Sequence, residues 1–189
     1  MTDEGNGSQG PDTGARRLCA ALSSDRPGLL AEACREAGFG RLFLAVLTDG
    51  TQVVIAPSGI EEVRLVHDLV DALTALVPDT PEPGGPPTGP ALLALNVGIL
   101  RVLDDGFTGA GLERARSLAN DAAVRAAVGE HLGADGEKRG GFAVVLSAGF
   151  YADLCDEGYE LQDWHPVRSS AAWFRWRDGC PDKLLSSSP

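Results

Sequence analysis

The chain has 189 residues, with 16 lysines and arginines against 27 aspartates and glutamates, and a formal net charge of −11. Its 43% of hydrophobic residues and mean hydropathy of −0.04 are typical of a globular protein that buries a core. A charge this negative argues against nucleic acid or an anionic membrane surface as a partner. No apolar run reaches the roughly 20 residues of a membrane-spanning helix, and no signal peptide is recognisable, so we expect a cytoplasmic protein.

The N-terminal part of the sequence predicts a tail, a short apolar element and a helix. Residues 1–15 hold almost nothing apolar to bury, and we expect a disordered tail there. The apolar run 18–22 fits a strand or a turn of helix, because periodicity does not decide over so few residues. From Asp25 to Ala37 apolar residues recur at helical spacing, which predicts a helix with Cys34 in the core rather than reactive.

A hairpin and a second helix follow. Two β-rich runs, 41–47 and 51–56, flank a Thr48-Asp49-Gly50 turn, and an Asp-Gly turn between such runs predicts a β-hairpin. A capping-box sequence at Ser58 precedes a helical apolar stripe over 59–77. Residues 78–90, PDTPEPGGPPTGP, hold six prolines in thirteen positions and predict an extended loop inside the domain.

The second half is organised around the run from Ala91 to Leu118. An apolar strand is expected over 91–103, followed by a turn at Asp104-Asp105-Gly106 and a helix entered through Phe107. The helical segments 110–119 and 122–132 are split at Asn120-Asp121, which can cap the second one.

The C-terminal part completes the expected sheet. A buried strand is predicted over 142–146, with Ser147 as the cap of a short helix, and the chain should return to the sheet between 159 and 176. Residues 179–189 are expected to form a second disordered tail. We therefore expect one domain over 16–178.

Several of these passages resemble class III nucleotidyl cyclase homology domains, the adenylate and guanylate cyclases. Asn96-Val97-Gly98-Ile99, the glycine-bearing turn after it and the helix sequence LERARSL (112–118) resemble the family's central strand and helix, and VVLSAGFYADL (144–154) resembles a later strand and helix. The resemblance spans about 18–176. It implies an α+β fold, a ferredoxin-like antiparallel sheet with helices packed on one face, and the composition resembles bacterial members without catalytic residues.

The resemblance also implies roles for particular positions. In the family, an aspartate in the turn between the second and third strands binds a catalytic metal, and Asp49 matches that position, although an ordinary hairpin turn explains it as well. Where the family's helix carries an asparagine and an arginine that contact ribose and phosphate, this chain has Glu113 and Ser117. Arg116 lies one position earlier, and we keep Glu113 and Arg116 as nucleotide-binding candidates.

Three tryptophans near the C-terminus are the remaining candidates. Trp164, Trp173 and Trp176 suggest either a stacking platform for bases or residues that close a core or an interface. In so acidic a chain we favour the interface.

No complete set of catalytic residues is present, and two functions stay open. We favour a non-catalytic regulatory or protein-interaction module that needs no cofactor and forms a homodimer or binds a protein partner. The alternative is a nucleotide-binding protein or a nucleotidyl cyclase, which would use Mg²⁺ or Mn²⁺ with ATP or GTP and could be the inactive half of a heterodimer. Two-metal chemistry needs paired carboxylates, and Asp49 stands alone in the sequence pattern.

Overall fold

The structure is a computed structural model, and it describes residues 14–39, 42–57, 61–77, 90–103, 106–133, 140–159 and 161–178. Its elements, in chain order, are β1 (Ala15–Ser23), α1 (Leu29–Glu36), β2 (Phe43–Val46), β3 (Gln52–Ile55), α2 (Glu62–Leu76), β4 (Ala91–Leu103), β5 (Gly106–Thr108), α3 (Ala110–Ala119), α4 (Ala122–Leu132), β6 (Gly141–Ser147), α5 (Ala148–Asp156), β7 (His165–Val167), the 3-10 turn η2 (Arg168–Ser170) and β8 (Ala172–Asp178).

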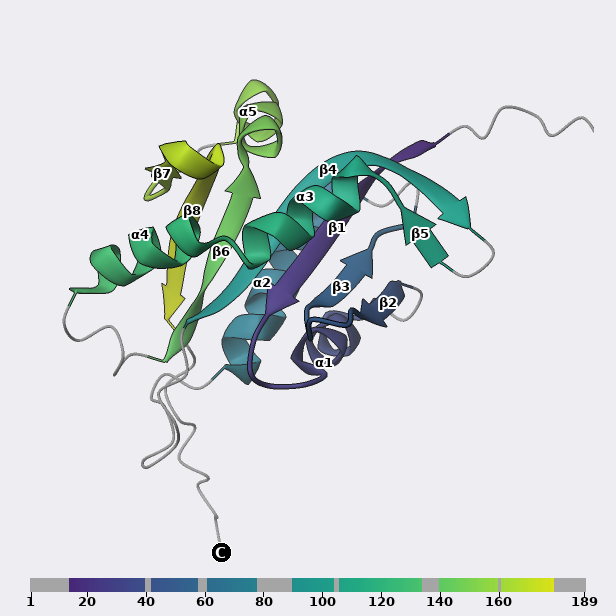
Figure 1. Cartoon of the computed structure of the whole chain (residues 1–189), viewed down its shortest axis with the longest axis horizontal. Helices are drawn as coiled ribbons and strands as arrows, with labels where there is room; N and C mark the ends of the chain where they lie inside the picture. The colour runs from purple at the N-terminus through teal and green to yellow at the C-terminus, as the bar shows by residue number, and fades with distance from the viewer. Residues whose placement is uncertain are drawn as a thin grey trace, which may run out of the picture.

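One sheet with the order β2-β3-β1-β4-β6-β8-β7 runs through the described chain (Figure 1). The first four strands pair antiparallel in the order of a ferredoxin-like unit, with α1 and α2 as the connecting helices. β4 then pairs with β6 in parallel, because α3 and α4 carry the chain back to the same end of the sheet. The prediction of an α+β fold built on one sheet is confirmed, with one parallel pair added to the antiparallel ladder.

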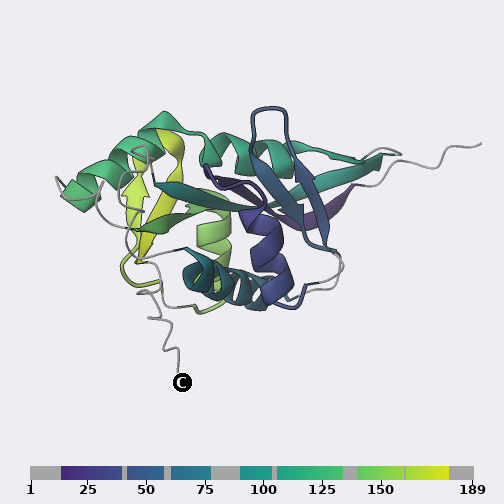
Figure 2. The same ribbon diagram turned by 90° about the horizontal axis from the view of Figure 1, so that it is seen from below.

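Helices cover both faces of this sheet, where the sequence analysis expected them on one (Figure 2). α1, α2 and α5 pack on the face that carries Leu18, Ala20 and Leu22 of β1. α3 and α4 pack on the face that carries Cys19 and Ala21 of the same strand. The reason lies in the strand sequence: residues 18–22 of β1 are all apolar and buried, so both faces of this part of the strand must be shielded from water.

Two local outcomes concern the first half of the chain. The ambiguous run 18–22 belongs to strand β1, and α1 begins at Leu29, later than expected, because Gly28 adopts a left-handed conformation with φ 75°. Cys34 is buried as predicted, and burial raises the pKa of its thiol to about 11. A thiol with that pKa stays protonated and unreactive at neutral pH. Ser58 lies outside the described residues, and Glu61 precedes α2 without a side-chain capping bond.

The hairpin and the second half of the chain follow the prediction closely, with one addition. The hairpin β2–β3, strand β4, the Asp121 cap of α4 and the Ser147 cap of α5 are confirmed. The addition is β5, which pairs back on β4 before α3 begins, so Phe107 lies in a strand rather than at a helix entry. Residues 104 and 105 of the predicted turn lie outside the described ranges. No helix in the described ranges has both the length and the hydrophobicity to cross a membrane.

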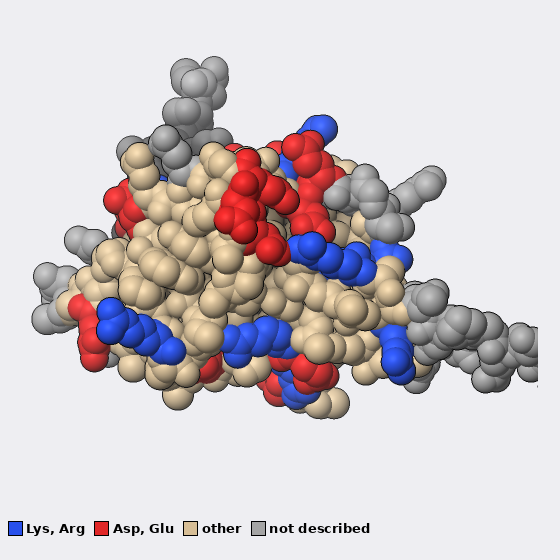
Figure 3. Space-filling view, turned by 90° about the horizontal axis from the view of Figure 1, so that it is seen from above, with Lys and Arg blue, Asp and Glu red and all other residues tan. Residues whose placement is uncertain are grey.

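Acidic side chains gather where α5 meets the start of α2. Burial raises the pKa of Glu62, nearby Arg16 opposes that effect, and the charges of Glu157 and Asp153 add to it. Arg16 also forms an ion pair with Asp153. The face of the molecule seen from above shows acidic side chains gathered in one group, with a basic side chain directly beside it (Figure 3).

Two glycines let α3 lie directly against the central strand. A Cβ on Gly98 of β4 would come within 2.6 Å of the Gly111 Cα, and a Cβ on Gly111 would come within 3.0 Å of Gly98. Beside them, the buried Asn96 side chain donates to the Gly111 carbonyl at 3.0 Å. Because the crowded atoms belong to the backbone, no side-chain rotation can relieve a clash there.

We expect Gly98→Ala to lower the free energy of unfolding by about 1 to 3 kcal/mol, since the added methyl overpacks the contact between β4 and α3. Urea denaturation followed by circular dichroism measures this loss. Gly129→Ala is the matched control: Gly129 lies in α4 with open space around its Cβ position, and alanine there should add about 0.5 to 1 kcal/mol. Equal stability of Gly98→Ala and the wild type would contradict the packing described here.

Candidate functional site

Asp49 lies in the turn between β2 and β3 and faces α3. Gly50 follows it with φ 82°, a left-handed conformation that glycine adopts without strain. The Thr51 backbone N–H donates to Asp49 Oδ1 at 3.0 Å. This bond is the usual way in which an aspartate side chain closes a turn on its own backbone. One of the two carboxylate oxygens is therefore already used within the hairpin.

Arg116 of α3 takes the other oxygen. Its Nε donates to Asp49 Oδ2 at 2.9 Å, and its Nη2 lies 2.9 Å from the same atom. Glu113, one turn earlier on α3, lies 3.9 Å from Arg116 Nη1 through its Oε2. The structure thus brings together Asp49, Arg116 and Glu113, which the sequence analysis had proposed separately as metal and nucleotide candidates.

A second bond joins the same two elements. The Asn120 side chain, at the end of α3, donates to Thr51 Oγ1 at 2.8 Å and to the Arg116 carbonyl at 3.1 Å. Thr51 is only 1% exposed. The hairpin turn is therefore held to α3 by one ion pair and one partly buried hydrogen bond, and these two contacts fix its position relative to the helix.

These contacts hold Asp49 in its ionised form. The Thr51 backbone hydrogen bond is the largest cause that lowers the pKa of Asp49, and Arg116 contributes through its hydrogen bond and its charge. Burial opposes them. With about a third of each side chain exposed, water screens the Asp49–Arg116 pair, so its contribution to stability is modest.

The arrangement fits a divalent cation poorly. Magnesium requires several oxygen ligands, and Asp49 has one oxygen bonded to Thr51 and the other to Arg116, which a cation would have to displace. Glu113 is 66% exposed and directed at Arg116. In the described ranges no group of three histidine, cysteine, aspartate or glutamate side chains is placed to hold a metal. Chemically, the pair of Asp49 and Arg116 can hold the hairpin against α3, with Glu113 beside it.

The three tryptophans do not share one surface. Trp173 stacks on Tyr151 with ring centroids 4.1 Å apart, and Trp164 lies edge-on to the same ring at 6.3 Å. Trp176 packs with the core on the opposite face of the sheet, and its Nε1 donates to Asp178 at 2.9 Å. Two of the three therefore close the side covered by α5, and the third closes the side covered by α4.

Several functional contacts escaped the sequence analysis. Arg114 donates to the carbonyls of Ser170 and Ala171 and holds the turn before β8. Arg175 and Arg177 line a hollow beside α2. The alternation Trp173, Arg175, Arg177 along the end of the chain was the available signal, because alternate residues of a strand share a face.

Comparison with known proteins adds one structural similarity. The crystal structure of an adenylate/guanylate cyclase/hydrolase from Silicibacter pomeroyi aligns with a TM-score of 0.44 and 17% identity, covering 87% of this chain and 99% of that chain. No protein-family model matches the sequence, and no curated protein matches it significantly. No residue role is transferred from that protein, and the chemistry of the site rests on the contacts described above.

The lowered pKa of Asp49 predicts how stability depends on pH. Because the folded-state pKa lies below the unfolded value, Asp49 stabilises the fold above the unfolded pKa, and this contribution disappears as pH falls through the folded pKa. We expect Asp49→Asn to lower the free energy of unfolding at pH 7 by about 0.5 kcal/mol, reduced by solvent screening. Denaturation curves of both proteins from pH 7 down to the acid limit should converge, and a pH-independent difference would contradict this account.

Proposed function

We propose that this chain is a non-catalytic protein-interaction domain with a cyclase-like architecture, and that two copies associate through the free edge of β2. The observation that carries the proposal is the contrast between the two edge strands of the sheet. β2 lies at one end of the strand order and β7 at the other. An edge strand presents unpaired backbone groups that can pair with another chain unless the sequence prevents it.

The β7 edge is protected and the β2 edge is not. Pro166 lies within β7, and a proline at this position removes a donor that a new strand would need. β2 has the sequence Phe43-Leu44-Ala45-Val46, with no charge and no proline. The exposed fractions of its three large side chains are 38%, 41% and 68% in chain order. An uncharged apolar edge strand is the feature that strand addition uses.

The backbone of β2 is oriented for such pairing. The Leu47 N–H donates to the Thr51 carbonyl at 2.9 Å, so this residue pair is hydrogen-bonded. In an antiparallel ladder, hydrogen-bonded pairs alternate with non-hydrogen-bonded pairs. Ala45 and Phe43 therefore point their backbone groups at β3, and Leu44 and Val46 point theirs outward. Two copies related by a twofold axis can pair these outward groups antiparallel, each supplying the same residues.

The state of Asp49 supports the non-catalytic half of the proposal. In a nucleotidyl transfer that uses metal ions, a carboxylate at this turn must be free to bind the ion. Here the neighbouring Arg116 and Thr51 already occupy both of its oxygens. At the position where the cyclase resemblance would place the family's asparagine, Glu113 carries a negative charge rather than a hydrogen-bond donor.

The edge proposal is tested by substituting Val46. Val46→Pro removes the outward N–H without breaking the β2–β3 ladder, and we expect it to convert a dimer to a monomer in light scattering. Val46→Thr keeps the N–H and the β-branched shape, and it should remain a dimer. Unfolding midpoints of both variants show whether the domain itself is intact. A wild-type monomer, or a Val46→Pro dimer of unchanged mass, would overturn the proposed interface.

Nucleotide binding distinguishes this function from the alternative. We expect calorimetric titration of the wild type with ATP or GTP, each with Mn²⁺, to show no binding, because the Asp49 carboxylate is engaged by Arg116. The control is Arg116→Met, which frees that carboxylate. Binding by the wild type that disappears in Asp49→Ala would contradict the non-catalytic assignment and would direct the next assays to cyclic products.

A further inference from the structure

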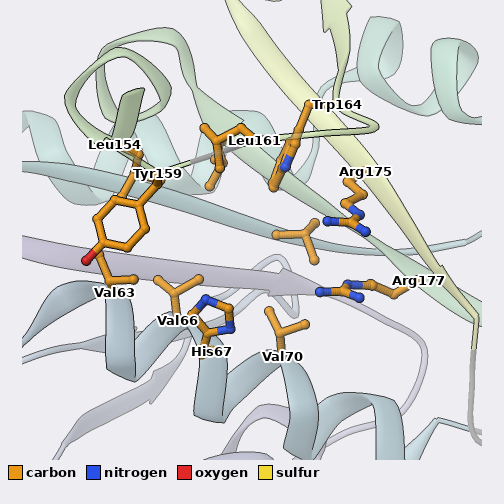
Figure 4. A pocket seen from close by; sticks show the side chains of 12 residues that line it. Val63, Val66, His67, Val70, Leu154, Tyr159, Leu161, Trp164, Arg175 and Arg177 are labelled. Carbon is orange, nitrogen blue, oxygen red and sulfur yellow. The ribbon is translucent and has the colours of Figure 1, made fainter. Parts of the chain in front are cut away.

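A hollow lies between α2, β6 and β8, on the face of the sheet opposite α3 (Figure 4). Val63, Val66 and Val70 of α2 form one wall, and Val144 and Leu146 of β6 form part of the floor. Leu154, Tyr159, Leu161 and Trp164 close the remaining sides. Its volume is about 140 Å³. An apolar protein cavity of about 150 Å³ accommodates benzene, so this hollow is large enough for one small ring.

Two arginines face into this apolar space from β8. Arg175 and Arg177 pair with Val144 and Phe142 of β6, and both partners belong to the core on the α2 side of the sheet. Their guanidinium groups point into the hollow, with His67 of α2 beside them (Figure 4). Positions with apolar neighbours of this kind normally take apolar side chains, so a pair of cations there costs solvation free energy that the fold does not require.

The charge of this pair is only partly compensated. Asp163 lies 3.8 Å from Arg175 through its Oδ2, and Asp163 is 79% exposed. Arg177 makes no side-chain hydrogen bond or ion pair with another described residue. Burial, followed by the charge of Arg175, lowers the pKa of Arg177, and Asp71 opposes this at a distance. Asp163 and Asp71 therefore compensate the charges of Arg175 and Arg177 only in part.

The two ends of the hollow differ in the charges that surround them. At the end far from the arginines, Val63 and Leu154 are each preceded on their own helix by an acidic residue. These residues are Glu62 and Asp153, which interact electrostatically. Arg16, which pairs with Asp153, offsets part of this negative charge, and an anion is favoured at the β8 end, where the two arginines lie. An apolar body fits between, against the valines of α2 and the ring of Tyr159.

We propose that this hollow binds a small carboxylic acid with an aromatic or branched apolar body, with the carboxylate on Arg175 and Arg177. The planar guanidinium groups match a carboxylate, and a pair of cations that is already partly compensated favours a monoanion over a phosphate dianion. The site is separate from Asp49 and from the β2 edge, because those lie on α3's side and at the far end of the sheet. The proposal of ligand binding and the proposal of dimerisation can therefore be tested independently, and failure of one does not affect the other.

The test uses benzoate and phenylacetate as probes, with neutral benzamide as the matched control and phenyl phosphate as the dianion. Calorimetry and ligand-observed NMR with the full chain should give dissociation constants on the order of 1 mM or lower for the carboxylates, as expected for ligands of this size. Benzamide should bind at least about tenfold more weakly, since it carries no negative charge and offers one acceptor oxygen where a carboxylate offers two. Phenyl phosphate should also bind more weakly than benzoate.

Substitutions of residues that line the hollow show whether benzoate binds there. Arg177→Met and Arg175→Met keep the apolar stem and should each weaken benzoate binding about tenfold. Val66→Phe fills the space and should abolish binding with both arginines present. Arg168→Met, an exposed arginine of η2 that does not line the hollow, should bind as the wild type does. Equal affinity for benzoate and benzamide, unchanged affinity in all three hollow variants, or no carboxylate binding by the wild type would each overturn the proposal.

Discussion

The burial of β1 and β4 on both faces is the constraint on which the rest of the structure depends. These two strands pair over nine residues, from Ala15↔Leu100 to Ser23↔Leu92. Their consecutive residues alternate between two separate cores, so neither face can be left to water. α1 and α2 cover one face as part of the ferredoxin-like unit. The other face must then be covered by the connection between β4 and β6, and α3 and α4 provide that cover.

This constraint explains residues that the cyclase resemblance had suggested for other reasons. Gly98 and Gly111 allow α3 to touch the β4 backbone, and Asn96 bonds to the Gly111 carbonyl inside that contact. The signature around the central strand is therefore accounted for by packing. Arg116 then extends from α3 over the β2–β3 turn and reaches Asp49. A close helix placed on this face brings the two charges together, and the resulting pair holds the turn.

The features that suggest function lie away from this packed centre. The uncharged edge of β2 is at one end of the sheet, and the hollow with Arg175 and Arg177 is near the other, on the opposite face from α3. Neither the uncharged edge strand nor the pair of arginines beside the core is expected from selection for folding stability alone. An edge strand without charge or proline is open to pairing, and two cations beside an apolar core are poorly solvated. A protein interaction and a small anionic ligand are the chemistries that would use them.

The sequence by itself determined several secondary-structure elements: the hairpin at Asp49-Gly50, strand β4, and the helix caps Asp121 and Ser147. These features depend on residues that are neighbours in the sequence, so hydrophobic periodicity and turn chemistry are enough to predict them. The sequence also placed Asp49, Glu113 and Arg116 among the candidate site residues. Only the tertiary structure decided that Asp49 meets Arg116 across 67 positions, and that Arg175 and Arg177 face valines of α2. Such contacts depend on strand order, register and the face that each helix covers, and local sequence patterns do not encode these.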